Sequence, residues 1–517
     1  MQQLPSPKFV RSKIAGGIGW ATVVGLFLTA ILFPILLVGC GGCNGDSQNK
    51  TSTDQKPAGP TLTMSCPDRR LADILAPMAK VWAARVGGKV EFTATPMAAT
   101  DQVDVGVMPF AELGEWADRG DLLPIPAALK EPGHPYQWSG VFAVYRGEPY
   151  AGWGSQLLSL PLAGDGFALV YRADLLADNP AKIEFQKQTR RSLLVPETWD
   201  DLADVAAFFS ARDKRPSMPL LPTDPARLVN LFSRVAASYD RSALGETAPG
   251  GKDKDEGPIG ESLAFQFHLR DGRPRIDSQS FRTAAGWLAD LRQRNCVPAD
   301  GPADPVAALT EGRAILAILS LDEIARLQGV NGRVDTRFGI APVPGARATV
   351  DPKTGSSVLS SGNYIPYFAG GWIGVVRKRC PRPDAAFDLL AELGGPARSQ
   401  ELLAAAAGYG PFRDSHLDPA RSIIWYGYGF DADQSKRLQQ AMQNYVGKTI
   451  RNPTYGLRGP DHTALTNALA DELKRVVAGA VLPNEAMKRV VTAWDKSTAG
   501  IPADKLTEWR RKAVGLY

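Results

Sequence analysis

The side chains that could do acid–base or metal chemistry are spread along this sequence without a catalytic spacing. None of the four histidines has the HExxH spacing that places two zinc ligands on one helix face: His134, His268, His416 and His462. Gly154-Ser155 lacks the further glycine of a GxSxG nucleophile elbow. Carboxylates are plentiful, so a glycosidase-type pair stays open, although no paired motif indicates one. We therefore expect no catalytic residue, no metal and no cofactor.

Asp165 is an acidic residue placed for binding, because it stands between two glycines in a turn. The segment 160–176 reads LPLAGDGFALVYRADLL, and its Gly-Asp-Gly turn leads into the apolar run 167–171. That run is short enough to be a buried strand. A flexible, acid-bearing turn that leads into a core strand suits a crossing point between two lobes. We predict that Asp165 lies at this seam, within reach of a ligand; the alternative is an ordinary turn.

Three tryptophans lie near glycines, which leave the backbone conformationally free, so their rings could project into a cleft. Trp153 lies between two glycines, and Trp372 follows Gly370 and Gly371. Because glycine has no side chain, this pair would let the backbone approach a ligand closely. Trp425 opens a glycine-broken aromatic run that suits the rim of a cleft. The alternative for each ring is core packing, the usual place of an aromatic side chain; Trp372 is our preferred stacking candidate.

Strand and helix patterns alternate from residue 61 onward. A short strand begins at Leu62, apolar residues at helical spacing follow over 71–86, and strands are predicted at 90–93 and 103–107. This alternation predicts a parallel α/β layer. Ligands in open α/β sheets bind beyond the carboxyl ends of strands. The loop that begins at Met108 is therefore predicted to face the ligand.

The length and charge of the chain limit the classes of protein to which it can belong. A chain of 517 residues is too long for one compact core and suggests two or more domains. The hydrophobic fraction of 44% and charged fraction of 22% are those of an ordinary globular protein. The net charge of +5 is spread along the chain without a dense basic block, which excludes a nucleic-acid partner. Cys66, Cys296 and Cys380 are buried thiols or include one disulfide.

The N-terminal sequence has the features of an export signal followed by a membrane anchor. Basic residues precede an uncharged, mostly apolar run over 14–39, and Leu37-Val38-Gly39-Cys40 resembles the lipobox of bacterial lipoproteins, which implies cleavage before Cys40 and its diacylation. An uncleaved transmembrane helix is the alternative, because the run exceeds the roughly 20 residues that span a bilayer. Both interpretations place the rest of the chain outside the cytoplasm. The polar segment 40–60 is predicted to be a flexible tether.

Several segments of the chain follow one another in a family's order. They are the acid-bearing turn and strand at 160–176, PETWDDL at 196–202, the helix, glycine and strand at 307–320, APVPG at 341–345, GGWIGVV at 370–376, GYGPFR at 408–413, and the closing helices at 465–494. The series resembles the extracellular solute-binding proteins of ABC importers, in the maltose-binding-like sugar family. The resemblance covers most of the chain after about residue 60.

This resemblance implies a two-lobed α/β fold of the type II periplasmic-binding-protein kind. Each lobe is expected to be a mixed sheet flanked by helices and built from discontinuous chain. Lobe 1 would comprise 61–163 and 339–410, and lobe 2 would comprise 164–338 and 411–517. The chain would cross between them at a hinge near Ala163–Asp165, Phe338–Pro342 and Gly410–Pro411.

The resemblance also implies a ligand site between the lobes. The family places a ligand-facing residue, often Trp, just beyond the strand that ends here at Ser320, but this chain has Leu321 and Asp322 there. Asp322 would accept sugar hydroxyls or cap the following helix. The predicted ligand-binding residues are Asp165, Trp372, Gly371, Asp322, Ser320, Met108, Trp153 and Trp425.

The expected function is that of a membrane-tethered, extracytoplasmic solute-binding component of an ABC transporter. The protein would be a monomer that captures a sugar, oligosaccharide or other small polar solute and delivers it to the permease transmembrane subunits. Closure of the lobes around the solute would be the state that the permease recognises. Two alternatives are an extracytoplasmic carbohydrate-active enzyme using Asp165 and Asp322, and a lipid-anchored sensory or scaffold lobe that carries no solute.

Overall fold

The computed structural model of the protein describes residues 59–240, 266–300, 304–327, 332–350, 356–364, 367–404, 410–421, 423–426, 429–445 and 453–516. The predicted signal segment, Cys40 and nearly all of the predicted tether lie outside these residues. Among the described helices, none is both long and apolar enough to span a bilayer.

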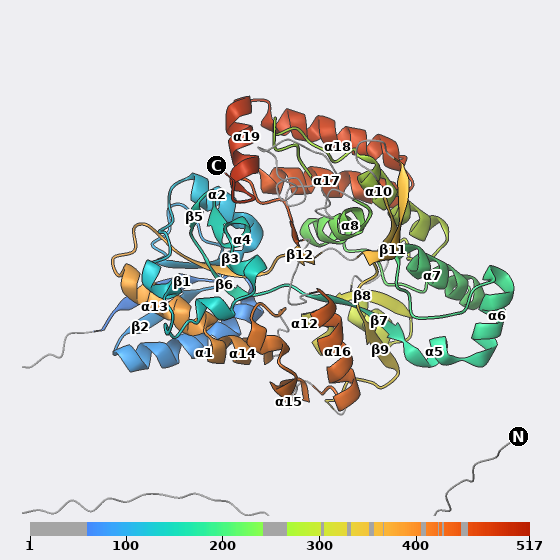
Figure 1. Ribbon diagram of the computed structural model, residues 1–517, viewed down its shortest axis with the longest axis horizontal. Coiled ribbons are helices and arrows are strands. Elements are labelled where there is room, and N and C mark those ends of the chain that lie inside the picture. The colour runs from blue at the N-terminus through green and yellow to red at the C-terminus, as the bar shows by residue number, and fades with distance from the viewer. Residues whose placement is uncertain are drawn as a thin grey trace, which may run out of the picture. The chain divides into compact units, whose positions relative to one another are not determined.

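In the described part of the chain, five strands form one sheet in the order β2-β1-β3-β13-β6. Their bounds are β1 Thr61–Ser65, β2 Lys89–Thr93, β3 Val105–Pro109, β6 Leu160–Ala163 and β13 Trp372–Val376. β1 runs parallel to β2 and β3, whereas β13 runs antiparallel to β3 and β6. The sheet is therefore mixed, and β13 joins it from the distant second half of the chain (Figure 1).

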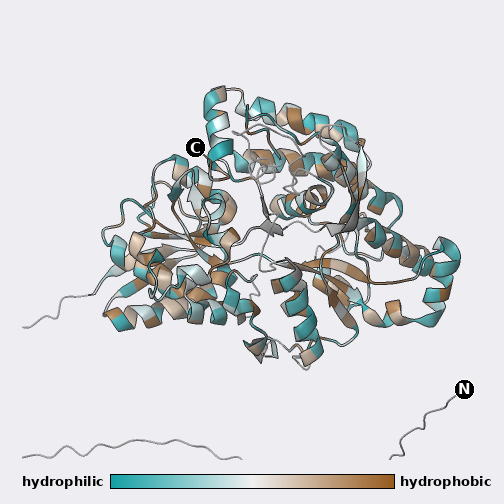
Figure 2. Ribbon diagram, in the orientation of Figure 1, coloured by the Kyte–Doolittle hydropathy of each residue, from teal (hydrophilic) through white to brown (hydrophobic). Residues whose placement is uncertain are grey.

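Helices cover this first sheet with apolar faces. α1 (Arg69–Val86) buries Leu71, Leu75 and Trp82 and contacts β2, and α13 (Pro383–Gly394) contacts β6 and β13. The strands of the molecule are mostly apolar in colour, while the helices carry both colours (Figure 2). Such two-faced helices bury one stripe against a sheet and expose the other, which is what stabilises an α/β layer.

A second sheet has the order β8-β7-β9 and is antiparallel throughout. Its strands are β7 Phe167–Arg172, β8 Leu316–Ser320 and β9 Phe338–Ala341. A separate group of mutually contacting helices lies beside it (Figure 1): α7 Trp199–Asp213, α8 Pro225–Tyr239, α10 Gln279–Gln293, α17 His462–Val477 and α18 Pro483–Thr498. Most of their buried apolar residues join one core cluster.

The remaining helices and strands connect or border these two parts. They are α2 Leu113–Asp118, α3 Ala143–Arg146, α4 Glu148–Ala151, β4 Gly152–Trp153, β5 Gln156–Leu157, α5 Ala173–Ala177, α6 Asn179–Thr189, α11 Pro305–Thr310, α12 Leu321–Ala325, β10 Ala346–Val350, β11 Ser357–Tyr364, β12 Tyr367–Ala369, α14 Pro396–Ala404, α15 Ile423–Tyr426, α16 Ala432–Tyr445, β14 Pro453–Tyr455 and α19 Ala503–Lys512.

The structure differs from one predicted crossing. Residues 338–341 were expected to return the chain to the first lobe, but they form β9, which pairs with β7 in the second sheet. Gly339 faces Tyr171 in this pairing, and a Cβ there would lie 2.2 Å from the tyrosine ring, so a larger residue would require the ring to move. The chain rejoins the first sheet only at Trp372, after β10, β11 and β12. The other lobe boundaries stay a prediction.

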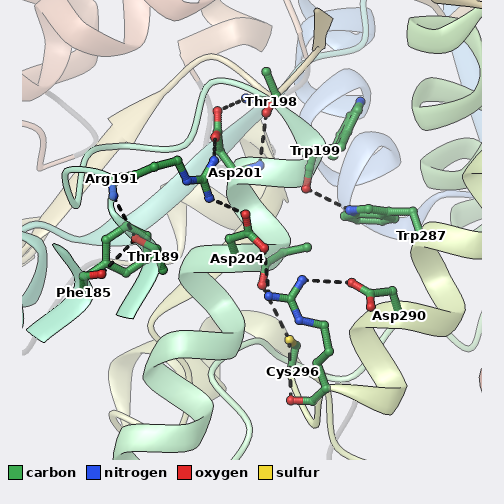
Figure 3. A network of polar contacts seen from close by, with 12 residues as sticks. Phe185, Thr189, Arg191, Thr198, Trp199, Asp201, Asp204, Trp287, Asp290 and Cys296 are labelled. Carbon is green, nitrogen blue, oxygen red and sulfur yellow. Dashed lines mark hydrogen bonds and ion pairs between the residues drawn. The ribbon is translucent and has the colours of Figure 1, made fainter. Parts of the chain in front are cut away.

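α7 begins at a capping box formed by Thr198 and Asp201. The Asp201 backbone N–H donates to Thr198 Oγ1 at 3.0 Å, and the Thr198 N–H donates to Asp201 Oδ2 at 3.3 Å. Trp199 follows the cap, and its carbonyl accepts a 2.9 Å hydrogen bond from Trp287 Nε1 on α10 (Figure 3). Their rings also pack edge to face with centroids 5.2 Å apart. This contact fixes α10, and with it Trp287, against the start of α7.

Two arginines reinforce the same junction by pairing with Asp204, and Figure 3 labels one of them, Arg191. Arg191 contacts Asp201 at 3.0 Å and also pairs with Asp204. Arg294 contacts Asp204 at 2.8 Å and Asp290 at 3.0 Å. Each of these groups is partly exposed, so a single pair contributes little, but a shared network orients α7 and α10 relative to each other.

Arg458 fastens the C-terminal part of the chain to the elements of the first sheet. Its buried guanidinium donates to the carbonyls of Pro149, Tyr150 (3.2 Å) and Gly152 (2.7 Å), as well as that of Ala513 (2.9 Å). Buried carbonyls that would otherwise lack partners are thereby satisfied. Helix α19 adds an ion pair to α2, since Lys505 Nζ lies 3.0 Å from Asp118 Oδ1.

The three described cysteines, Cys66, Cys296 and Cys380, are buried free thiols. Burial raises the pKa of the Cys66 and Cys296 thiols to about 12 and that of Cys380 to about 11. These thiols therefore stay protonated at neutral pH and pack as small apolar groups.

Candidate functional site

A cavity of about 400 Å³ lies where loops of the first sheet meet α8 and α17. Six parts of the chain build it: the turn after β3, the crossing at Asp165, the N-terminal turns of α8, the glycine pair before β13, Gly456 with Leu457, and the N-terminal turns of α17. The lining residues are Pro109, Phe110, Ala111, Glu112, Asp165, Asp224, Pro225, Ala226, Val229, Asn230, Ser233, Gly370, Gly371, Gly456, Leu457, His462, Thr463, Thr466 and Asn467.

Asp165 is held at the crossing by a pair of facing glycines. Gly164 and Gly410 exchange backbone hydrogen bonds of 2.9 and 3.0 Å, so two of the predicted hinge segments lie side by side. A Cβ on Gly164 would lie 2.4 Å from the carbonyl oxygen of Pro411, and one on Gly410 would lie 2.1 Å from that of Asp165. No larger residue fits this crossing without moving the backbone. The Asp165 N–H is fixed by Tyr145, whose hydroxyl accepts it at 3.1 Å.

The Asp165 carboxylate connects the crossing to α8. Its Oδ2 lies 3.0 Å from Arg234 Nη2, and both side chains are largely buried. Arg234 Nε donates to Asn230 Oδ1 at 2.7 Å, and its guanidinium lies 4.3 Å from the ring centroid of Phe167. A buried carboxylate requires such a partner, since desolvation without one would be costly. Asp165 thus lines the cavity as half of an ion pair.

Gly370 and Gly371 form the wall opposite α8. Gly371 has φ +107°, and a Cβ there would lie 2.2 Å from the carbonyl oxygen of Ala163. Its own carbonyl accepts the Phe110 N–H at 2.9 Å, and the Gly370 carbonyl accepts the Tyr150 hydroxyl at 2.9 Å. The glycine pair therefore lets β13 start tightly against the crossing segment while its backbone borders the cavity.

The turn after β3 contributes Phe110 and Glu112. Phe110 is buried: Tyr150 stacks on it with centroids 4.4 Å apart, and the Arg458 guanidinium lies 4.5 Å from its centroid. Its faces are thus engaged by protein groups. Glu112 is half-buried, and burial raises the pKa of its carboxyl to about 7, with Glu115 adding to the shift. At neutral pH this carboxyl can donate or accept a hydrogen bond.

The N-terminal turns of α8 present a small, polar face. Asp224 caps the helix, because its Oδ1 accepts the Arg227 N–H at 2.8 Å. Ala226, Val229, Asn230 and Ser233 follow at the i, i+3, i+4, i+7 spacing of one helix face, and all four line the cavity. The face offers an amide and a hydroxyl between small apolar side chains.

α17, which packs against α8, contributes a second polar face through His462, Thr463, Thr466 and Asn467. His462 Nδ1 lies 3.1 Å from the Gly459 carbonyl, which can only accept, so Nδ1 carries the proton. Nε2 then accepts from the Thr463 hydroxyl at 3.2 Å. Burial lowers the pKa of His462, which keeps the ring neutral at pH 7.

The cavity therefore combines amides, hydroxyls, carboxyls and a neutral imidazole. Among the described lining residues there is no lysine or arginine. Within the described residues, no group of three acidic, histidine or cysteine side chains could hold a metal ion. Mixed donors and acceptors around a chamber of this size suit a small polyhydroxylated molecule.

Of the predicted ligand-binding residues, the structure brings Asp165 and Gly371 to this cavity. Met108, Trp153 and Trp425 are buried, with 2%, 6% and 3% of their surface exposed, and none of them lines it. Their side chains fill the core instead, which is the alternative that the sequence left open for the two rings.

Trp372 and Ser320 are not among the described lining residues, and the structure does not decide the case of Asp322. Trp372 is partly buried, pairs with Pro109 and Ala163 as the first residue of β13, and packs against the core beneath. Ser320 caps α12, its hydroxyl donating to Glu323 Oε2 at 3.0 Å. Asp322 belongs to α12, so it lies inside the helix, and its side chain lies outside the described part.

Sequence reasoning missed Glu112, Asn230, His462 and Asn467. Glu112 lies two residues beyond the loop that was predicted to face the ligand. The polar residues of α8 and α17 recur at helical spacing within the first turns of amphipathic helices, which is a readable signal. What the sequence lacks is any sign that residues 224–233 and 456–467 come together with the turn after β3.

Two sheet-centred parts with a polar cavity where they meet are the features of a two-lobed solute-binding protein. The comparisons agree: the family model described as "Bacterial extracellular solute-binding protein" matches residues 90–423, and the chain belongs to this family. The family and the two-lobed α/β fold expected from the motifs are thereby confirmed. No curated protein matches the sequence.

Solved structures with bound or named carbohydrates share the fold. Maltose-bound MalE3 of T. maritima is 15% identical, with a TM-score of 0.58 over 84% of this chain and 98% of that one. The cyclic alpha-maltosyl-1,6-maltose binding protein from Arthrobacter globiformis is 15% identical, with a TM-score of 0.60 over 86% and 100%. Lmo0181 from Listeria monocytogenes, an ABC substrate-binding protein in complex with cycloalternan, is 13% identical, with a TM-score of 0.58 over 86% and 99%.

Proposed function

We propose that this protein captures an uncharged sugar or oligosaccharide between its lobes and passes it, chemically unchanged, to the transmembrane subunits of an ABC permease. The observation that carries the proposal is the polar cavity between the first-sheet loops and the helices α8 and α17. Membership of the extracellular solute-binding family and the carbohydrates named for its structural neighbours support it.

The chemistry of the lining favours an uncharged solute over an anionic one. Glu112, Asp165 and Asp224 border the cavity, and no lysine or arginine does so among its described residues. A phosphate or carboxylate would meet these acids without a cationic partner, and desolvating it there would be unfavourable. Hydroxyl groups, in contrast, can donate to the carboxyls and accept from Asn230, Asn467 or the threonine hydroxyls.

A thermal-shift screen of the full chain tests the proposal. Neutral oligosaccharides should raise the melting temperature by a few degrees, because a ligand at 100 times its Kd stabilises the folded state by about 2.7 kcal/mol. Sugar phosphates and uronic acids should leave it unchanged. Chromatography of the incubated sugars should recover them intact, whereas steady cleavage would identify an enzyme instead.

A matched pair of variants locates the binding site. Asn467→Ala removes an amide that lines the cavity, and Asn484→Ala removes an exposed amide from the neighbouring helix α18. By calorimetric titration, the first change should weaken sugar binding up to about 10-fold, the equivalent of one lost hydrogen bond, and the second should not. Equal affinities for the two variants would place the sugar elsewhere.

We further propose that the chain works as a monomer tethered to the outer face of the cytoplasmic membrane through Cys40. Membership of an extracellular family supports the extracytoplasmic location. Lipidation of Cys40 and recognition by a permease rest on the sequence pattern and the family resemblance. A tether would keep the carrier beside the permease and raise its effective concentration there.

A further inference from the structure

A second, smaller cavity of about 120 Å³ lies on the adjoining side of α8. Its walls are mainly apolar and come from four elements and a loop: Phe167 on β7, Ile318 on β8, Leu231 on α8, Trp287 on α10, and Leu220 and Leu221 in the loop before α8. None of these residues lines the larger cavity. The sugar-binding proposal leaves this space without a role.

The two cavities are immediate neighbours. Asp224 and Asn230 line both of them. The Asp165–Arg234 ion pair lies on the boundary, since Asp165 borders the larger cavity and Arg234 the smaller one, with 3.0 Å between their charged atoms. Arg234 also covers Phe167, which lines only the smaller cavity. One molecule seated against Asn230 can therefore reach both spaces.

The walls of the smaller cavity are held in place by contacts that no ligand has to make. Trp287 is anchored by its hydrogen bond to the Trp199 carbonyl at the capped start of α7 (Figure 3). Prolines 219, 222 and 305 also border the cavity, and each restricts its own backbone. A pre-formed apolar space demands little ordering from a guest, so burying an apolar group there is favourable.

We propose that this smaller cavity is a subsite for an alkyl or aryl group carried by the solute. The inference rests on the proposed function and names its substrate class: a glycoside with an apolar substituent, whose sugar lies in the larger cavity. The size fits, because apolar cavities of about 150 Å³ in proteins stay dry and accept a benzene-sized molecule. Thr223, Asp224, Arg227, Asn230 and Arg234 also line this cavity. An apolar group suits the side of Leu231, Trp287 and Ile318 better than a sugar ring, whose hydroxyls would lose hydrogen bonds against these three side chains.

Pairs of glycosides that share one sugar and differ only in a methyl or phenyl aglycone provide the test. Calorimetric titration of the full chain should show the phenyl glycoside binding about 10-fold more tightly, because its ring leaves water for an apolar pocket. Leu231→Asn places an amide in the wall and should abolish this preference while leaving the methyl glycoside nearly unaffected. Leu175→Asn is the matched control, since Leu175 is also partly buried against the same core but lines neither cavity.

Equal affinity for the two glycosides, or a preference that survives Leu231→Asn, would overturn the inference. If Leu231→Asn does not fold, Ile318→Thr replaces it, because threonine is also β-branched and suits strand β8. If neither glycoside binds, the proposed function fails for that sugar, and benzene then decides the present inference alone. Benzene binding that is lost in Leu231→Asn and kept in Leu175→Asn supports an apolar subsite; absence of benzene binding to the unmodified chain overturns it.

Discussion

At the scale of single residues, the protonation of Glu112 is coupled to folding. Burial in the cavity wall raises the pKa of its carboxyl from 4.5 to about 7. A raised folded-state pKa means that the folded protein prefers the protonated form. The stability that this preference gives is fully present below pH 4.5 and is lost as the pH rises through about 7.

Replacing Glu112 with glutamine should remove this dependence, because the amide stays neutral at every pH. Between pH 4.5 and pH 7.5 the unmodified protein should lose up to about 3 kcal/mol of unfolding free energy relative to Glu112→Gln. Urea denaturation of both proteins at several pH values measures the difference. Parallel pH profiles for the two proteins would show that Glu112 titrates normally in the folded state.

Of the residues predicted to bind the ligand, Asp165 and Gly371 line the cavity, whereas packing places Trp153 and Trp425 in the core. The Gly-Asp-Gly turn located Asp165 because only glycine fits the contact between Gly164 and Gly410. The environment of the tryptophans was harder to predict, because the local sequence allows a ring beside glycines to face either a cleft or the core. Trp153 and Trp425 are buried in the structure, and nothing in their neighbouring residues distinguishes the two outcomes.

At the scale of elements, the start of β13 depends on one backbone conformation. Gly371 has φ +107° and no room for a Cβ, so Gly371→Ala should destabilise the fold by at least about 2 kcal/mol. Gly286→Ala is the matched control, because Gly286 lies within α10 with open space around it. Alanine there should stabilise the helix by roughly 0.5–1 kcal/mol.

Thermal and urea denaturation of the two variants should therefore shift in opposite directions. A tolerated alanine at Gly371 would mean that β13 can start without its close contact to Ala163. Sugar binding should weaken in Gly371→Ala and stay unchanged in Gly286→Ala, since only Gly371 borders the cavity.

Helices and strands could be predicted from the sequence where their formation depends only on nearby residues. The alternating strands and helices at the start of the first sheet depend on patterns within a few residues. β9 was misplaced because its pairing with β7 joins strands far apart in the sequence, which local patterns do not reveal. The convergence of α8 and α17 on one cavity is likewise a long-range event without a local signal.

At the scale of the whole molecule, the proposed N-terminal anchor would determine where the carrier works. Cys40→Ser should release the protein from the membrane fraction into the soluble fraction if Cys40 is cleaved and lipidated. Cys43→Ser should leave it bound, because that cysteine lies outside the lipobox pattern. Fractionation followed by immunoblotting measures both.

Retention of the Cys40→Ser protein at the membrane, with the segment 14–39 still attached by mass spectrometry, would identify an uncleaved transmembrane helix. The rest of the chain would still lie outside the cytoplasm, because the basic residues before the segment favour the inner side. Solute capture would be unaffected in either case, since no described cavity residue belongs to that segment.

The links made by Arg458 have a consequence for how the chain is produced. They join the neighbourhood of Pro149 to residues about three hundred positions later, so the earlier portion cannot complete its packing until the ribosome has nearly finished. Contacts so distant in sequence form slowly. The carbonyls of Pro149, Tyr150 and Gly152 therefore lack this guanidinium partner until residue 458 has been synthesised.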